Sequence, residues 1–183
     1  MLLVVAGPSG VGKGTIVSRL RELAPSLWES VSYTTRAPRP DEVDGVDYCF
    51  VTREEFEALR DAGGFLEWFE VFGDLKGTPR GPVDEHLAAG HDVLLEIDVQ
   101  GALKVREQFP DAVLVFVRPP SPDELRRRLV ERGTESPESL DRRLAAAAAE
   151  EARAPDFDHV VVNDDLERVV AEVAGILSGS SSR

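Results

Sequence analysis

The stretch GPSGVGKGT at residues 7–15 contains the first residues whose types and spacing suggest chemistry. The pattern G-x-x-x-x-G-K is typical of loops that hold phosphate groups. Backbone N–H groups of such loops point into one concavity at the start of a helix, and the lysine adds a positive charge. The stretch predicts a nucleotide-phosphate site, and an ordinary strand–helix turn is the alternative. The residues expected to contact the nucleotide are Gly7, Pro8, Ser9, Gly10, Val11, Gly12, Lys13, Gly14 and Thr15.

The position after Lys13 departs from the usual pattern of such loops. Gly14 stands where a hydroxyl residue commonly binds magnesium, and the hydroxyl of Thr15 comes one residue later. Because Mg²⁺ keeps much of its water and is held largely by a nucleotide's own phosphates, the missing ligand is tolerable where carboxylates order that water. Glu96 and Asp98 end the apolar run at 93–98, where the tip of a strand would face the loop, although a solvated strand end would look the same. We expect no direct metal ligand from the protein, and Asp98 acting through water.

A second anion site is predicted by Arg36 and Arg39, in the stretch SVSYTTRAPRP at residues 30–40. Pro38 and Pro40 favour an extended polyproline conformation with about three residues per turn, in which the two arginines project to the same side. Two planar guanidiniums that converge bind a phosphate dianion well, such as that of a nucleoside monophosphate. For this segment taken alone, a solvated loop is the alternative.

Two residues further along the chain are suited to contact a base. Tyr48 lies in GVDYCF, and Glu67 lies in FLEWFEVF at residues 65–72. The carboxylate of Glu67 would either point to solvent or accept two hydrogen bonds from adjacent N–H donors, which guanine offers at N1 and at its exocyclic amine. Adenine presents an acceptor at N1, so such a site would reject it, because the wrong base leaves buried polar groups unpaired.

Short apolar runs that alternate with helical patterns must position these residues. Continuous β-branched runs predict strands covered on both faces, at 2–7, 93–98, 112–117 and 159–162. Helices are predicted at 13–23, at 121–130, from 136–137 through the alanine run 145–149, and from 164 or 165 to 177. The alternation predicts an α/β fold, an open parallel sheet of the phosphate-loop type with helices on both faces.

The segment that precedes residue 91 differs in composition from the rest of the chain and is rich in proline and charged residues. Within it we predict a helix capped at Thr52 and a half-exposed strand at 65–72. We interpret it as a lobe inserted into a single domain at 1–178. This domain would comprise a core at 1–30 and 91–178, the lobe at about 31–90 and a short helical lid at about 126–150. The serine-rich residues 179–183 are predicted to form a disordered tail.

The composition argues against several classes of function. The 183-residue chain carries a net charge of −13, which disfavours nucleic acids and anionic membranes as partners. The single cysteine, Cys49, excludes an intrachain disulfide, and the three histidines lack the spacing of a zinc site. Since no apolar run has the length of a signal peptide or a membrane span, we expect a cytoplasmic protein.

Taken together, these stretches resemble the guanylate kinases over nearly the whole chain. The motifs that carry the resemblance are GPSGVGKGT, S-x-S-x-TTR-x-PR (30–39), G-x-DY (45–48), FLEW (65–68), G-x-x-x-GT (73–78), EIDVQGA (96–102), RGTES (132–136), RRLAAA (142–147) and VVVNDDL (160–166). The resemblance implies transfer of the γ-phosphoryl group of Mg-ATP to GMP or dGMP. It also implies that ATP and GMP are the partners, that Mg²⁺ is the cofactor, that no obligate protein partner is needed, and that the inserted lobe binds GMP.

The resemblance further implies roles for individual residues. Lys13 and Arg36 would be catalytic, together with the lid arginines Arg132 and Arg143, which would swing onto the transferring phosphoryl group. Asn163 would lie beside the adenine of ATP. The GMP site would comprise Ser32, Arg36, Arg39, Tyr48, Glu67, Thr78, Glu96 and Asp98. Lys76 departs from the family, which usually has tyrosine there, so we expect activity with an altered affinity for GMP.

Two other interpretations remain open on the residues alone. One is a non-enzymatic binding module built on the same fold, against which the intact Lys13, Arg132 and Arg143 argue. The other is a kinase of a different small phosphorylated substrate, against which Ser32 and Glu67 argue because they suit guanine.

Overall fold

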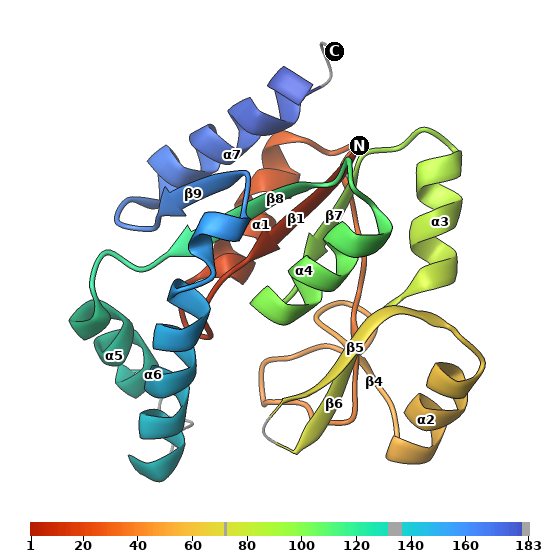
Figure 1. Cartoon of the computed structure of the whole chain (residues 1–183), viewed down its shortest axis with the longest axis horizontal. Coiled ribbons are helices and arrows are strands. Elements are labelled where there is room, and N and C mark those ends of the chain that lie inside the picture. Colours follow the sequence, from red (N-terminus) through yellow and green to blue (C-terminus); the bar gives the residue numbers. More distant parts are fainter. Residues whose placement is uncertain (72, 132–136, 181–183) are drawn as a thin grey trace.

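The computed structural model describes residues 1–71, 73–131 and 137–180. Its main unit is a five-stranded sheet in the order β2-β7-β1-β8-β9, in which every neighbouring pair is parallel (Figure 1). The strands are β1 (Leu2–Ala6), β2 (Trp28–Glu29), β7 (Val93–Glu96), β8 (Val113–Arg118) and β9 (His159–Val162). The predicted open parallel sheet is confirmed, and its edge strand β2 adds two residues that the apolar pattern does not mark as a strand.

The alternation of side chains along β1 supplies both faces of this sheet with core residues. Leu3 and Val5 pack against α1 (Lys13–Leu23) and α7 (Leu166–Ser180). Leu2 and Val4 pack on the opposite face against α3 (Arg80–Ala88) and α4 (Val99–Gln108). Helices therefore cover both faces, as the continuous apolar strands predict.

Two helices beside the carboxyl edge of the sheet form the region predicted to be a lid. They are α5 (Pro122–Glu131), whose first turn is capped by the hydroxyl of Ser121, and α6 (Pro137–Glu151). The two helices pack through Leu125, Leu129, Leu140 and Ala147. A short 3₁₀ turn, η1 (Ala154–Asp156), follows them.

The last helix corrects one prediction from the sequence. α7 continues to Ser180, so residues 179 and 180 are helical instead of belonging to the predicted tail. The hydroxyl of Ser178 donates to the carbonyl of Ala174, one turn back, so this serine is accommodated within the helix. Within the described residues, no helix combines the length and the apolar character that crossing a bilayer requires.

The lobe holds a second sheet, in the order β4-β3-β6-β5. Its strands are β3 (Tyr33–Thr34), β4 (Cys49–Phe50), β5 (Phe65–Val71) and β6 (Asp74–Pro79). Helix α2 (Arg53–Asp61) is capped by Thr52 as predicted, through a capping box with Glu55, and packs Phe56 against Phe65 and Leu75. The lobe lies below the main sheet in the view of Figure 1.

The lobe is joined to the main core along β5. Leu66 belongs to the same hydrophobic cluster as Val83 of α3 and Val99 of α4. The backbone carbonyl of Leu66 also accepts a hydrogen bond from the side chain of Gln108, at the end of α4. This seam fixes β5 against the main sheet, so residues next to Leu66 have a defined position relative to the phosphate loop.

Candidate active site

The phosphate loop, residues 7–15, follows β1, which is the central strand of the main sheet. Gly7, Gly10 and Gly12 all have a positive φ, and two of these positions illustrate why the loop requires glycine. At Gly7, where φ is 150°, a Cβ would lie 2.3 Å from the carbonyl oxygen of Val117. At Gly12, where φ is 99°, it would lie 2.6 Å from Nδ2 of Asn163. Gly12 is the residue that precedes α1, so the positive end of this helix opens onto the loop.

Lys13 lies over its own loop. Its Nζ donates hydrogen bonds to the carbonyl oxygens of Gly7, at 2.7 Å, and of Pro8, at 3.3 Å. These bonds hold the ammonium against the first two residues of the loop. The placement suits a point charge that meets the terminal phosphates of a nucleotide.

Helix α6 brings two charged residues to the same place. Nη1 of Arg143 donates to the hydroxyl of Ser9 at 2.7 Å, so this predicted lid arginine contacts the phosphate loop. Burial raises the pKa of Glu150, the charge of Lys13 opposes that rise, and Asp98 adds to it. The other predicted lid arginine, Arg132, lies outside the described residues.

Asn163 and Arg128 hold the phosphate loop in place through hydrogen bonds to its backbone at Val11. The buried amide of Asn163 donates to the carbonyl of Val11 at 2.7 Å. Arg128 of α5 donates to the same carbonyl at 3.1 Å, to the carbonyl of Asn163 at 3.0 Å, and to Glu124. The sequence does not single out Arg128 within the run of arginines at 126–128. Its place three residues after the buried Leu125 was the only signal that it faces inward.

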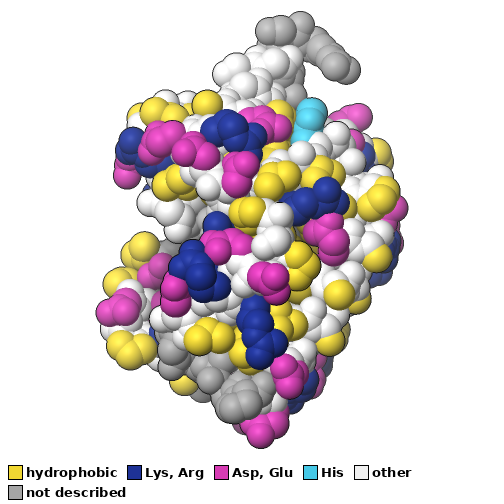
Figure 2. Space-filling view, turned by 90° about the vertical axis from the view of Figure 1, so that its left-hand side faces the viewer, with side chains coloured by type: hydrophobic (Ala, Val, Ile, Leu, Met, Phe, Trp, Pro, Cys, Tyr) yellow, Lys and Arg dark blue, Asp and Glu magenta, His cyan; other side chains and the backbone are white. Residues whose placement is uncertain are grey.

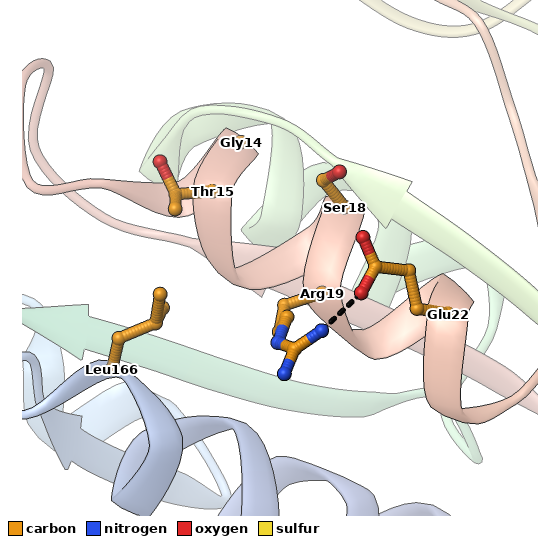
Figure 3. A pocket seen from close by; sticks show the side chains of 6 residues that line it. All are labelled: Gly14, Thr15, Ser18, Arg19, Glu22 and Leu166. Carbon is orange, nitrogen blue, oxygen red and sulfur yellow. Dashed lines mark hydrogen bonds and ion pairs between the residues drawn. The ribbon is translucent and has the colours of Figure 1, made fainter.

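Thr15 and Gly14 border a hollow of about 410 Å³ between α1 and the start of α7 (Figure 3). The side chains that line it are those of Thr15, Ser18, Arg19, Glu22 and Leu166. Arg19 and Glu22 pair with each other along one wall.

Of the two carboxylates predicted at the strand tip, Glu96 lies beside the loop and Asp98 lies at the start of α4. Glu96 ends β7, the neighbour of β1, and its Oε2 lies 3.5 Å from the point where a Cβ on Gly14 would be. Asp98 accepts a hydrogen bond from the backbone N–H of Gly101 at 2.8 Å and thereby caps α4. Among the described residues, no group of three or more histidine, cysteine, aspartate and glutamate side chains is arranged to hold a metal.

The arginine pair, Arg36 and Arg39, converges as the proline-rich segment predicts, and it converges on Glu42. Nη2 of Arg36 lies 2.8 and 2.9 Å from the two carboxylate oxygens of Glu42, and Nη1 of Arg39 lies 3.3 Å from one of them. Burial acts to raise the pKa of Glu42, but the backbone N–H of Arg39 and the two guanidiniums together hold it below its ordinary value. Glu42 is not among the residues predicted for this site from the sequence. The signal that was available is a carboxylate three residues after Arg39, on the next turn of the chain.

Aromatic rings and a third cation surround the arginine pair. The guanidinium of Arg36 lies 5.5 Å from the ring centroid of Tyr48 and 5.8 Å from that of Phe50. Nζ of Lys76 donates to the hydroxyl of Tyr48 at 3.2 Å. Ser32 is half-buried on the adjoining backbone, where its carbonyl accepts from the N–H of Cys49. The structure thus brings the predicted residues of the second anion site together.

Glu67 is buried at the seam of the lobe, not turned to solvent. The hydroxyl of Thr78, its cross-strand partner on β6, donates to Oε1, while Oε2 lies against Gly101 of α4. Burial raises the pKa of Glu67 to about 7. The bond from Thr78 opposes that rise, and the charge of Asp98 adds to it. Asp98 therefore interacts electrostatically with the Glu67 carboxyl on one side and with Glu150 on the other.

The face that carries α5, α6 and β9 shows acidic and basic side chains interspersed (Figure 2). No broad patch of one sign is visible there in spite of the net charge of −13. On this face, anion binding would therefore depend on small local groups of cations and backbone N–H groups.

Comparison with known proteins gives consistent matches. Residues 1–180 match the family described as guanylate kinase. A guanylate kinase of Symbiobacterium thermophilum is 55% identical over 183 residues, which cover all of this chain and 87% of that protein. A guanylate kinase of Thermus thermophilus is 54% identical over 182 residues, which cover all of this chain and 82% of that protein.

Solved structures agree. The crystal structure of guanylate kinase from Anaplasma phagocytophilum superposes with a TM-score of 0.84 at 36% identity, covering all of this chain and 87% of that one. The shikimate kinase from Bacteroides thetaiotaomicron superposes with a TM-score of 0.53 at 16% identity, over 97% of this chain and 98% of that one. This second likeness concerns the fold alone.

Proposed function

This chain belongs to the guanylate kinase family, and because it therefore transfers the γ-phosphoryl group of ATP to GMP, we propose that the phosphate loop holds ATP and the arginine pair holds GMP. The core is then 1–30 and 91–178, the lobe at about 31–90 binds GMP, and the lid spans about 126–150. The observation that carries this division is the convergence of Arg36 and Arg39 on one carboxylate, at a site separate from the phosphate loop.

ATP is bound through its phosphates at the positive end of α1. The N–H groups of the phosphate loop and Nζ of Lys13 contact the β- and γ-phosphates, and Arg143 approaches from the lid. The contact of Arg143 with Ser9 supports its role. The ribose and adenine extend from Thr15 into the hollow next to Leu166, with Asn163 bracing the loop beside them.

GMP is held at both ends. Its phosphate lies against Arg36 and Arg39, with Tyr48 and Ser32 beside it and Lys76 as an additional cation. Its guanine donates from N1 and the exocyclic amine to the two oxygens of Glu67, and Thr78 keeps that carboxylate in place. dGMP is accepted in the same way, because this recognition uses the base and the phosphate.

Transfer breaks the bond between the γ-phosphorus and the oxygen that bridges it to ADP, and it forms a bond from the γ-phosphorus to a phosphate oxygen of GMP. The products are ADP and GDP. Such a reaction needs alignment of the two phosphates and stabilisation of charge more than a covalent catalyst. Lys13, Arg36 and Arg143 supply that charge, and Arg132 is assigned the same role from the sequence.

The residues present fit Mg²⁺ held through water. Glu96 and Asp98 offer the oxygen ligands that Mg²⁺ prefers, and Gly14 offers no hydroxyl. When bound with ATP, the ion would neutralise charge on the β- and γ-phosphates. The chain's own contribution is to order the water between the ion and these two carboxylates.

Replacing Gly14 with serine is expected to lower the Mg²⁺ concentration that gives half-maximal rate by several-fold. The new Cβ would meet Glu96 at an ordinary contact distance of 3.5 Å, so the side chain fits and adds a hydroxyl ligand. The measurement is a Mg²⁺ titration of the initial rate at saturating ATP and GMP. Gly175→Ser, at an open position on α7, is the matched control. An unchanged Mg²⁺ dependence would mean that residue 14 does not face the metal.

The acceptor assignment is tested by assaying GMP, dGMP, AMP and UMP in parallel with Mg-ATP. We expect turnover of GMP and dGMP, and values of kcat/KM for AMP and UMP that are lower by about a hundredfold or more, since neither adenine nor uracil offers two adjacent N–H donors to a buried carboxylate. Comparable turnover of AMP would contradict the placement of guanine at Glu67.

A further inference from the structure

We propose that Glu42 is a positioning residue for the acceptor: its carboxylate holds the guanidiniums of Arg36 and Arg39 together in the arrangement that receives the phosphate of GMP, and it remains bound to them when GMP binds. The inference rests on the proposed placement of that phosphate at the arginine pair. It concerns a residue that neither nucleotide is proposed to contact.

The bonds of Glu42 join the two arginines directly. Both oxygens of the carboxylate lie within 2.9 Å of Nη2 of Arg36, and Oε1 also lies 3.3 Å from Nη1 of Arg39. Both bonds from Arg36 come from one nitrogen, so the Nε–H edge of that guanidinium does not contact this carboxylate. Nη2 is held by Glu42 and Nη1 donates to the carbonyl of Ala37 at 2.7 Å, so within the described residues Nε–H is the donor of this guanidinium that is left to meet a second anion.

Glu42 is also fixed to the backbone, which distinguishes it from a mobile counter-ion. Its Oε2 accepts from the backbone N–H of Arg39 at 2.8 Å, and its own N–H donates to the carbonyl of Arg39 at 3.1 Å. The two bonds close the turn at residues 39–42 on itself. Displacing the carboxylate would open this turn. We therefore expect Glu42 to remain bound to the arginines when a phosphate binds to them.

The balance of charge at the site favours the same conclusion. Arg36 and Arg39 carry two positive charges within reach of one carboxylate, and only 18%, 25% and 13% of the side chains of Arg36, Arg39 and Glu42 are exposed. Without Glu42 the two guanidiniums would repel each other under weak screening and separate. With it, the group keeps one net positive charge, and Lys76 beside Tyr48 adds a second. The phosphate of GMP, with close to two negative charges, matches that total.

A different role for Glu42 predicts the opposite result. If its carboxylate occupied the place of the phosphate and left when GMP bound, removing its charge would tighten GMP binding. A positioning role predicts weaker binding, because the arginines lose their shared partner and must be ordered by the ligand itself. The sign of the change therefore decides between the two roles.

The test compares Glu42→Gln with Asp41→Asn, which removes the neighbouring exposed carboxylate. We expect Glu42→Gln to raise KM for GMP by about tenfold while KM for ATP changes by less than about twofold, and Asp41→Asn to leave both unchanged. Equilibrium binding supplies a second readout. Glu42→Gln should weaken binding of GMP and leave binding of guanosine, which has no phosphate, unaltered.

Each other outcome overturns the inference. A lower KM for GMP would identify Glu42 as a displaced stand-in for the phosphate, and an unchanged KM would show that it does not order the arginines. Equal losses for GMP and guanosine would indicate a general structural role. Arg39→Gln is the companion variant: if it leaves KM for GMP unchanged, the proposed phosphate site itself is wrong. If it raises KM while Glu42→Gln does not, only the role of Glu42 is wrong.

Discussion

Replacing Lys13 with methionine is expected to lower kcat by about a thousandfold, the order that follows from removing one preorganised donor to developing charge. Methionine keeps most of the length and apolar body of lysine and removes the ammonium, which lies against the carbonyls of Gly7 and Pro8, the first two residues of the phosphate loop. The charge is needed most when the γ-phosphoryl group is between its two oxygen partners, so kcat should fall more than the affinity for ATP.

The measurement is the steady-state rate of GDP formation at saturating ATP and GMP, together with ATP binding and the melting temperature of the variant. Lys104→Met, at an exposed position on α4 where the lysine pairs with Glu107, is the matched control and should retain full activity. A kcat within about tenfold of the parent would remove Lys13 from the catalytic group.

The second large effect is expected for Glu67→Gln. A glutamine offers one acceptor and one donor where guanine needs two acceptors, so kcat/KM for GMP should fall by about a thousandfold. The same amide is complementary to adenine, which has an acceptor at N1 and an amine next to it, so turnover of AMP should rise. Glu70→Gln, on an exposed position of the same strand β5, should change neither. Unchanged preference for GMP in Glu67→Gln would place the base elsewhere.

A pH dependence of GMP binding is also expected, and it should differ between the parent protein and Glu67→Gln. Burial raises the pKa of Glu67 to about 7, so below that pH the free protein holds a proton that guanine binding must expel. KM for GMP should therefore rise by up to about tenfold per pH unit as the pH falls below 7. The Glu67→Gln variant retains only the ionisation of the GMP phosphate itself. A profile that is identical in the two proteins would contradict the assignment.

The effect of pH on folding stability should be opposite in direction to its effect on GMP binding. The folded protein keeps the Glu67 proton up to about pH 7, whereas the unfolded chain releases it near the ordinary pKa of a glutamate, about 4.3. This group's contribution to the free energy of unfolding therefore declines as pH rises between those two values.

The features that depend on local sequence pattern were predictable. The strands at 2–7 and 93–98 are continuous apolar runs, and the phosphate loop is a fixed spacing of glycines followed by Lys13, so both can be read from neighbouring residues. The proline-rich segment likewise predicted that Arg36 and Arg39 point to the same side, because proline restricts the backbone locally.

The remaining features depend on residues that meet only after folding. The two-residue strand β2 exists because Trp28 and Glu29 pair with β7, not because of their own pattern. Burial of Glu67 results from packing against Gly101 of α4, which lies more than thirty residues away in sequence. Arg128 faces the phosphate loop because α5 lies beside it, and within the run of arginines at 126–128 only its spacing from Leu125 marks it as the inward one.

The seam at Leu66 gives the two ends of the GMP lobe different freedom. Glu67 is the next residue along β5 and is fixed to the main core, whereas Arg36 follows β3, which is separated from β5 by the strand β6. Rotation of the lobe about β5 would carry the arginines through a longer arc than the carboxylate. The base of an incoming nucleotide would then contact Glu67 before rotation of the lobe moves its phosphate together with the arginines. A nucleotide with an unsuitable base would therefore dissociate before the lobe rotates.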